Sequence, residues 1–229
     1  MMFENHAIID LSWPVHTNMP VFPGILKTFL GVYRGHKDSF RPPDISTQTN
    51  IMVMSDHAGT HIDAPLHFNP NGTGIDFMPV DKMIGNAAMQ DFSFKKPGES
   101  VPLTEVKKNF ESAGINPKNL TYILFRTGAA DYYHTDEYVA HYLEIRTDLV
   151  EWLLDQGIFV FGVDASAVDH PKDRATHMLM RKRLFYQIEN LRNLDKLPQD
   201  RIFTFFCAPM LLKDSSASPI RALALIPAI

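Results

Sequence analysis

Four side chains able to bind a metal ion are concentrated in one short segment of the 229-residue chain, His57-Ala-Gly-Thr-His61-Ile-Asp63-Ala-Pro-Leu-His67. Imidazole and carboxylate groups are the usual nitrogen and oxygen ligands of Zn²⁺, and they also bind Mn²⁺. Isolated core or surface histidines would not give such a density. The segment therefore predicts a divalent metal site with His57, His61 and Asp63 as ligands.

The spacing of these residues leaves the local backbone open. His57 and His61 can face the same way on one helical turn, and a tight turn through Gly59 would serve equally well. The segment lacks the internal glutamate of the His-Glu-x-x-His metalloprotease motif, so the general base has to be another residue. His67 is the nearest candidate, because an imidazole with a pKa of about 6.5 can take up and return a proton near neutral pH. We predict that His67 is catalytic.

Composition and charge are those of an ordinary globular chain, with 45% hydrophobic residues, 21% charged residues and a formal net charge of −4. No apolar run approaches the roughly 20 residues of a membrane-spanning helix, and the first residues lack a signal-peptide pattern. We therefore expect a cytoplasmic protein without a membrane partner. The basic cluster Arg181-Lys-Arg183 fits a solvated helix face, so nucleic acid is not an expected partner. The single cysteine, Cys207, is expected to be a buried thiol.

The elements expected around the histidine segment alternate between strands and helices. Strands are expected at residues 7–11, 47–54, 122–125, 158–161 and 202–206. Helices are expected at residues 104–113, with Thr104 as N-cap and Gly114 at the end, and at residues 147–156, ending at Gly157. This order predicts an α/β fold, and no linker or repeat divides the chain, so residues 1–229 are expected to form one domain.

The histidine segment resembles the signature of the cyclase-like family of metal-dependent hydrolases, which includes the bacterial kynurenine formamidases and the isatin hydrolases. Two further blocks also look like that family. They are Phe161-Gly-Val-Asp164-Ala-Ser166-Ala-Val-Asp169, and His177 followed by Gln187-Ile-Glu189-Asn190. The resemblance implies a single-domain swivelling β/β/α fold that assembles into homodimers or homotetramers, with substrate sites near the subunit contacts.

The resemblance also implies a fuller metal site than the spacing alone. In the formamidase branch two ions are expected, one on His57, His61 and Asp63 and the other on Asp63, His177 and Glu189. Other branches use a single Mn²⁺, so the expected cofactor is Zn²⁺ or Mn²⁺, with one or two ions per subunit. Without the resemblance, His177 and Glu189 would be assigned plain structural roles.

The reaction implied is hydrolysis of a small amide, formamide or lactam, in which a metal-activated water attacks the carbonyl and His67 carries the proton. Phe22 lies where the formamidase branch has a tryptophan that holds the aromatic substrate, and it still offers a flat apolar face. Three alternatives stay open. They are an isatin-hydrolase-like lactam opening, a metal-dependent lyase or dehydratase, and a non-catalytic metal- or ligand-binding relative.

Overall fold

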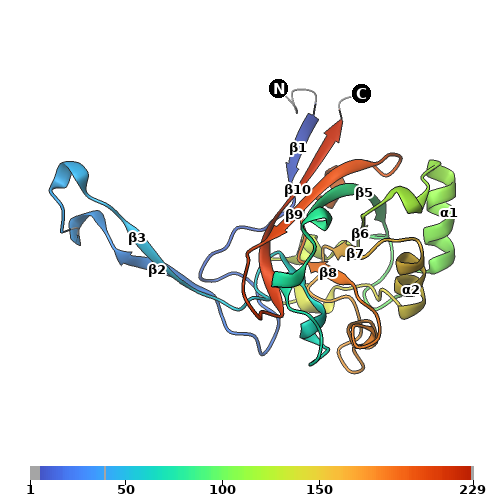
Figure 1. Cartoon of the computed structure of the whole chain (residues 1–229), viewed down its shortest axis with the longest axis horizontal. Coiled ribbons are helices and arrows are strands. Elements are labelled where there is room, and N and C mark those ends of the chain that lie inside the picture. The colour runs from blue at the N-terminus through green and yellow to red at the C-terminus, as the bar shows by residue number, and fades with distance from the viewer. Residues whose placement is uncertain (1–5, 39, 228–229) are drawn as a thin grey trace.

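The computed structural model describes residues 6–38 and 40–227 (Figure 1). Its strands are β1 (His6–Asp10), β2 (Phe29–Arg34), β3 (Thr49–Val53), β4 (His61–Asp63), β5 (Ile84–Asp91), β6 (Tyr122–Arg126), β7 (Val160–Val163), β8 (Tyr186–Glu189), β9 (Phe203–Pro209) and β10 (Ala217–Pro227). Its α-helices are α1 (Leu103–Ala113), α2 (Thr147–Asp155) and α3 (Ala175–Leu179).

Within these described residues, seven strands close into a barrel. Their order is β10-β4-β8-β7-β6-β5-β9, and β9 pairs with β10 to complete the ring. Strands β5 to β8 run parallel to one another, and the other pairings are antiparallel. Strand β1 adds to the ring by pairing with the far end of β10.

The two faces of the barrel strands differ in what covers them. Apolar side chains from all seven strands, such as Ile62, Ile188 and Phe205, form one buried cluster inside the barrel. On the outer face, β5, β6 and β7 are covered by α1 and α2 (Figure 1), with Phe125 and Phe110 in a second buried cluster. Because side chains alternate along a strand, β4 and β8 also have residues that face outward, and these residues are polar and buried.

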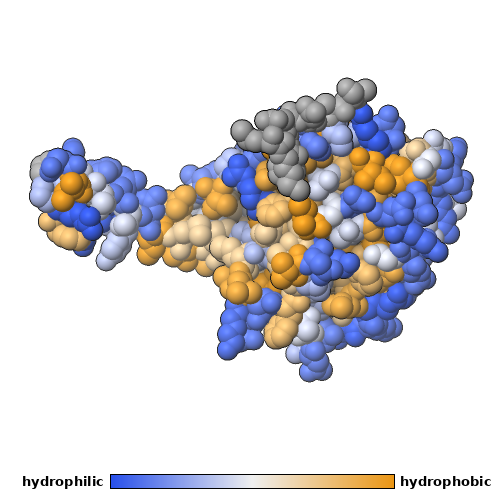
Figure 2. Space-filling view, turned by 45° about the horizontal axis from the view of Figure 1, so that its top comes forward, coloured by the Kyte–Doolittle hydropathy of each residue, from blue (hydrophilic) through white to orange (hydrophobic). Residues whose placement is uncertain are grey.

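Strands β2 and β3 form a separate two-stranded antiparallel ribbon that projects away from the barrel (Figure 1). We call residues 29–53 the arm. All of β3 is exposed, and the cross-strand pairs Phe29 with Val53 and Leu30 with Met52 place apolar side chains on both faces. Figure 2 shows hydrophobic residues gathered where the arm meets the body. The arm is thus an apolar surface without a covering layer in one copy of the chain.

Most of the expected elements are confirmed. The fold is mixed α/β, and both predicted helices are present within one or two residues of their expected bounds. The N-cap prediction was wrong, because Pro102 is the N-cap of α1 and Thr104 lies inside the helix. The strand expected from residue 158 begins at Val160, since the Ile158 amide still donates to the Leu153 carbonyl at the end of α2.

One expectation about a single residue has a clear outcome. Cys207 is fully buried on β9, and this burial raises the pKa of its thiol to about 12. Among the described residues, no helix is both long and apolar enough to cross a membrane.

Candidate metal centre

Two adjacent strands bring four polar side chains together. In the antiparallel register of β4 with β8, His61 lies opposite Glu189 and Asp63 lies opposite Gln187. The intervening isoleucines point into the barrel, so these four side chains share the outer face. All four residues are buried, and the most exposed of them, Glu189, has only 6% of its surface accessible. The pairing of two very short strands therefore builds a buried polar cluster.

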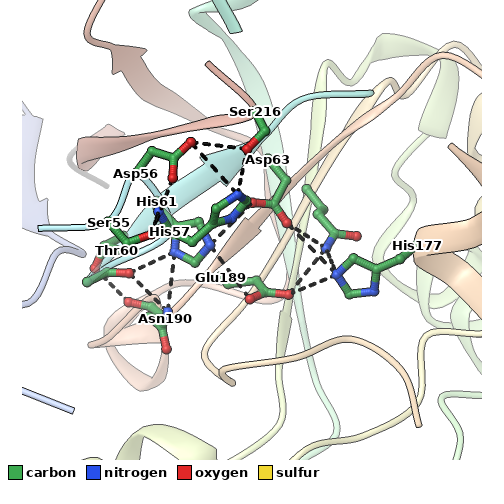
Figure 3. A network of polar contacts seen from close by, with 12 residues as sticks. Ser55, Asp56, His57, Thr60, His61, Asp63, His177, Glu189, Asn190 and Ser216 are labelled. Carbon is green, nitrogen blue, oxygen red and sulfur yellow. Dashed lines mark hydrogen bonds and ion pairs between the residues drawn. The ribbon is translucent and has the colours of Figure 1, made fainter. Parts of the chain in front are cut away.

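The turn before β4 brings His57 to His61 and Asp63 (Figure 3), and the loop after β4 brings His67 to His57. His57 lies in a tight turn in which Gly59 has a φ of 70°, so the turn and not the helix is the correct alternative. His57 Nδ1 is 2.8 Å from Asp63 Oδ1, and His61 Nε2 is 3.3 Å from the same oxygen. The ring of His67 lies 4.0 Å from that of His57. His57, His61, Asp63 and His67 thus converge.

The outer nitrogens of His57 and His61 are already engaged. His57 Nε2 lies 2.9 Å from Ser216 Oγ, and His61 Nδ1 donates to the Gly59 carbonyl at 2.9 Å. Such outer hydrogen bonds fix the tautomer of a metal-binding histidine and turn its other nitrogen inward as an electron-pair donor. Ligand atoms of His61, Asp63 and Glu189 lie within 4.8 Å of one another. The residues present therefore fit a divalent cation.

The charges around this cluster favour a cation as well. Burial alone would raise the pKa of Asp63, but His57 and His61 outweigh it and hold that pKa well below its usual value. Burial alone would lower the pKa of His61, but Asp63 and Glu189 raise it to about 9. The buried carboxylates thus attract positive charge to this point.

His67 differs from the other histidines in its electrostatics. Burial, together with the nearby imidazoles of His57 and His177, lowers the pKa of His67 to about 4 despite the opposing effect of Asp63. One ring nitrogen of His67 lies within 4.8 Å of ligand atoms of His57 and Asp63, and the His67 ring packs beside those of His57 and His177. The imidazole of His67 is therefore neutral at pH 7.

The two residues indicated only by the family resemblance also lie at the cluster. His177 Nε2, on α3, is 3.6 Å from Glu189 Oε1 and 3.9 Å from Asp63 Oδ2. Its Nδ1 lies 2.8 Å from Oδ2 of the fully buried Asp169. Burial would raise the pKa of Asp169, but the hydrogen bonds from His177 outweigh it and lower that pKa. Asp169 therefore orients His177, a role that the sequence did not indicate.

A cavity of 220 Å³ opens beside the cluster. Phe22, the predicted substrate-binding residue, lies in its wall near Ile25 and Phe68, and the Arg174 guanidinium carbon is 4.8 Å from the Phe22 ring centre. Several residues at the cluster or in this wall were not predicted from the sequence: Tyr138, Arg174, Gln187 and Ser216. Of these, Gln187 could have been found from its position two residues before Glu189, because such residues share one face of a strand.

Comparison with known proteins identifies the family of this chain. Residues 9–170 match the family model named Cyclase. The chain belongs to the cyclase family. It is 30% identical over 222 residues to a kynurenine formamidase of Paracidovorax citrulli, which covers 96% of both chains. It is also 30% identical over 216 residues to a kynurenine formamidase of Bacillus cereus, covering 93% of this chain and 95% of that one.

The cyclase fold is confirmed by a solved structure as well. The crystal structure of an isatin hydrolase bound to the product analogue thioisatinate superposes with a TM-score of 0.85 and 22% sequence identity, covering 99% of this chain and 94% of that chain. The family resemblance predicted from the motifs is therefore correct. The part matched by the family model contains His57 to His67 and ends before His177 and Glu189, so those two residues are placed at the site of this cyclase by the geometry above.

Proposed function

We propose that this cyclase-family protein is a metal-dependent hydrolase that cleaves the C–N bond of a small amide, formamide or lactam. The observation behind this proposal is the convergence of His57, His61 and Asp63 beside a cavity that His67 also lines. The kynurenine formamidases among its relatives support the same reaction class.

The proposed ligands of the first ion are His57, His61 and Asp63, with Zn²⁺ or Mn²⁺ as the metal. A divalent ion held there supplies an activated water and polarises the substrate carbonyl. The chain itself contributes the orientation of the ligands, because Ser216 and the Gly59 carbonyl hold the outer nitrogens of the two histidines. Asp63 adds the negative charge that a buried cation needs.

The proposed role of His67 is to move the proton. Its imidazole is neutral at pH 7 because its pKa is lowered to about 4, and it lies beside His57 at the cavity. It can take a proton from the attacking water and deliver it to the nitrogen of the leaving group. The other histidines of the described cavity wall, His57, His61 and His177, each have one ring nitrogen engaged in a hydrogen bond.

The cavity wall favours an aromatic substrate with a carboxylate. Phe22 offers an apolar face for ring stacking, and Arg174 lies against that face with one of its N–H groups bonded to Asp169 at 3.3 Å. A guanidinium has five N–H donors, so most of those on Arg174 can still bind an anionic group. N-Formylkynurenine, an aryl formamide with a carboxylate, has this chemistry.

The first experiment is turnover of N-formylkynurenine by the purified protein with added Zn²⁺ or Mn²⁺ and with a chelated control. We expect chelator-sensitive release of formate, with ¹⁸O from labelled water in that formate. Turnover without the label would contradict hydrolysis and favour a lyase. If metal is bound but no turnover occurs, formamidase activity is wrong and isatin-like lactams become the next substrates to assay.

We also propose that the protein is a homo-oligomer joined through the arm. An isolated two-stranded ribbon is at best marginally stable in water, yet this one exposes Tyr33 (71%), Val32 (59%) and Met52 (50%). A second copy presents the same apolar ribbon, so a two-fold contact between arms would cover both at once. The arm is anchored at its base by Thr17, whose hydroxyl bonds both the amide and the carbonyl of Leu30.

A further inference from the structure

Asp63 separates two groups of possible metal ligands. Its Oδ1 faces His57 and His61, at 2.8 and 3.3 Å. Its Oδ2 lies toward His177 and Glu189, and Figure 3 shows these side chains turned toward one another. A second cation bridged by Asp63 would have to bind three atoms, Asp63 Oδ2, His177 Nε2 and Glu189 Oε1.

The side-chain amide of Gln187 already contacts all three of these atoms. Its nitrogen Nε2 is 2.9 Å from Asp63 Oδ2, 2.6 Å from His177 Nε2 and 3.2 Å from Glu189 Oε1. Gln187 is fully buried, and its place opposite Asp63 in the β4–β8 register directs its side chain to the same face as Glu189. The strand pairing thus fixes the position of this amide.

The orientation of the amide follows from its surroundings. Two carboxylates face it, so the nitrogen with its two hydrogens is attracted, whereas the oxygen Oε1 would be repelled from the same place. Oε1 points the other way, where it is buried and finds no hydrogen-bond partner among the described residues. The amide nitrogen of Gln187 therefore lies between Asp63 and Glu189, and its oxygen Oε1 is left without a hydrogen bond among the described residues.

We propose that Gln187 occupies the second cation position, so that the protein holds one divalent ion per chain, on the side of His57 and His61. A cation bound by Asp63 Oδ2, His177 Nε2 and Glu189 Oε1 would compete for the electron pairs that the amide uses. The partly positive NH₂ group replaces that cation without adding a net charge. This inference rests on the proposed metal-dependent function and fixes the number of ions.

The test is the metal content of the purified protein after equilibrium dialysis against MnCl₂, measured by elemental mass spectrometry. We expect one Mn²⁺ per chain for the wild type and two for Gln187→Leu, which removes the amide at similar size. Gln187→Glu adds a carboxylate at the same place and should also bind two. Gln90→Leu is the matched control and should still bind one ion. Gln90 is another buried glutamine, on β5, and its amide donates to the Val106 carbonyl of α1.

A second measurement needs only the wild type. Two Mn²⁺ ions bridged by Asp63 would be magnetically coupled, so electron paramagnetic resonance of the Mn²⁺-loaded protein should show an uncoupled ion if the inference is correct. A coupled spectrum, two ions in the wild type, or one ion in both Gln187 variants would overturn it. Wild-type protein that binds no ion would contradict the proposed function as well, whereas two ions would contradict the inference alone.

Discussion

Two regions depart in opposite ways from the usual burial of apolar side chains and exposure of charged ones. They are the arm and the outer face of strands β4 and β8. At β4 and β8, acidic and imidazole groups are buried, with Asp63 only 1% exposed. In the arm, apolar groups are exposed, with Tyr33 at 71%. Buried charges need a compensating charge, and a large exposed apolar surface usually marks an interface. The two regions therefore differ in the partner that we propose for each, a cation at β4 and β8 and a second copy of the chain at the arm.

The two regions are nevertheless joined in the chain. Phe22 and Ile25 line the cavity shortly before β2 begins, and His57 follows the end of β3 by four positions. The arm therefore leaves and re-enters the body at the cavity. If the site and the arm nevertheless act separately, a substitution in one should leave the other unchanged.

Asp63→Asn should reduce amide hydrolysis to the level of the chelated enzyme. The substitution keeps the size of the side chain but removes the negative charge that both imidazoles face, so metal content should fall with activity. The assembly should not change, because the arm is untouched. The control is Asp131→Asn, which should keep both activity and metal. The carboxylate of Asp131 is exposed, with 72% of its side chain accessible. A variant of Asp63 with full metal content would show that this carboxylate is not a ligand.

His67→Ala should lower kcat by about 10²- to 10⁴-fold, the usual contribution of a general acid–base residue, while the metal content stays at the wild-type value. The measurement is kcat together with metal analysis on the same preparation. The exposed His16 provides the control as His16→Ala. If the metal were lost together with activity, His67 would be a ligand and its proposed role in proton transfer would be wrong.

Ile51→Thr combined with Val53→Thr should dissociate the assembly. Both residues lie on β3 on the face of the arm that also carries Phe29, and threonine keeps the strand preference while removing apolar surface. Each change costs about 1 kcal/mol of burial and is counted twice in a two-fold contact, so the dissociation constant should rise about 1,000-fold. Light scattering after size exclusion measures this.

The arm experiment has a control on the same strand. Asn50→Thr changes a polar position of the same strand without removing apolar surface, and it should leave the assembly intact. Metal content should stay unchanged in all arm variants if the site and the arm act separately. A monomeric wild type would contradict the proposed assembly outright.

The part of the site that the sequence predicted is the part that is contiguous in the chain. His57 to His67 lie within one turn, one three-residue strand and one short loop, so their spacing alone suggested a common target. Glu189 meets them only because β8 pairs with β4 across more than 120 positions, as in the contact of Gln187 with Asp63, and His177 comes from the separate helix α3. Strands of three and four residues show no measurable periodicity, so no sequence pattern predicted that pairing.

For the fold, too, only features set by local sequence patterns were predicted. The two helices and the buried parallel strands were predicted because their apolar spacing is local. The alternation in residues 47–54 correctly predicted the strand that spans Thr49–Val53, but it carries no information about whether either face is covered, and both faces of β3 are exposed. The N-cap error at Thr104 arose because a residue suited to capping lies one position inside the helix that Pro102 caps.

The smallest expected effect concerns the cavity wall, where the site and the base of the arm meet. Arg174→Met should raise KM for N-formylkynurenine about 10-fold, since a hydrogen-bonded charge contributes roughly 1.5–3 kcal/mol and solvent weakens it at a partly exposed side chain. Kcat should change little, because Arg174 contacts Phe22 and Asp169 and no residue that we place on the metal.

The methyl ester of N-formylkynurenine distinguishes binding of the substrate carboxylate by Arg174 from a structural role of Arg174. It lacks the carboxylate charge, so its KM should be similar in the wild type and in Arg174→Met, and Arg174→Lys should restore part of the preference for the acid. Arg146→Met, at a side chain that is 57% exposed on α2's N-terminal flank, controls for loss of a surface charge. An equal rise in KM for the acid and the ester would mean that Arg174 acts through Asp169 on the position of His177. The cavity wall would then determine the geometry of the site as well as its choice of substrate.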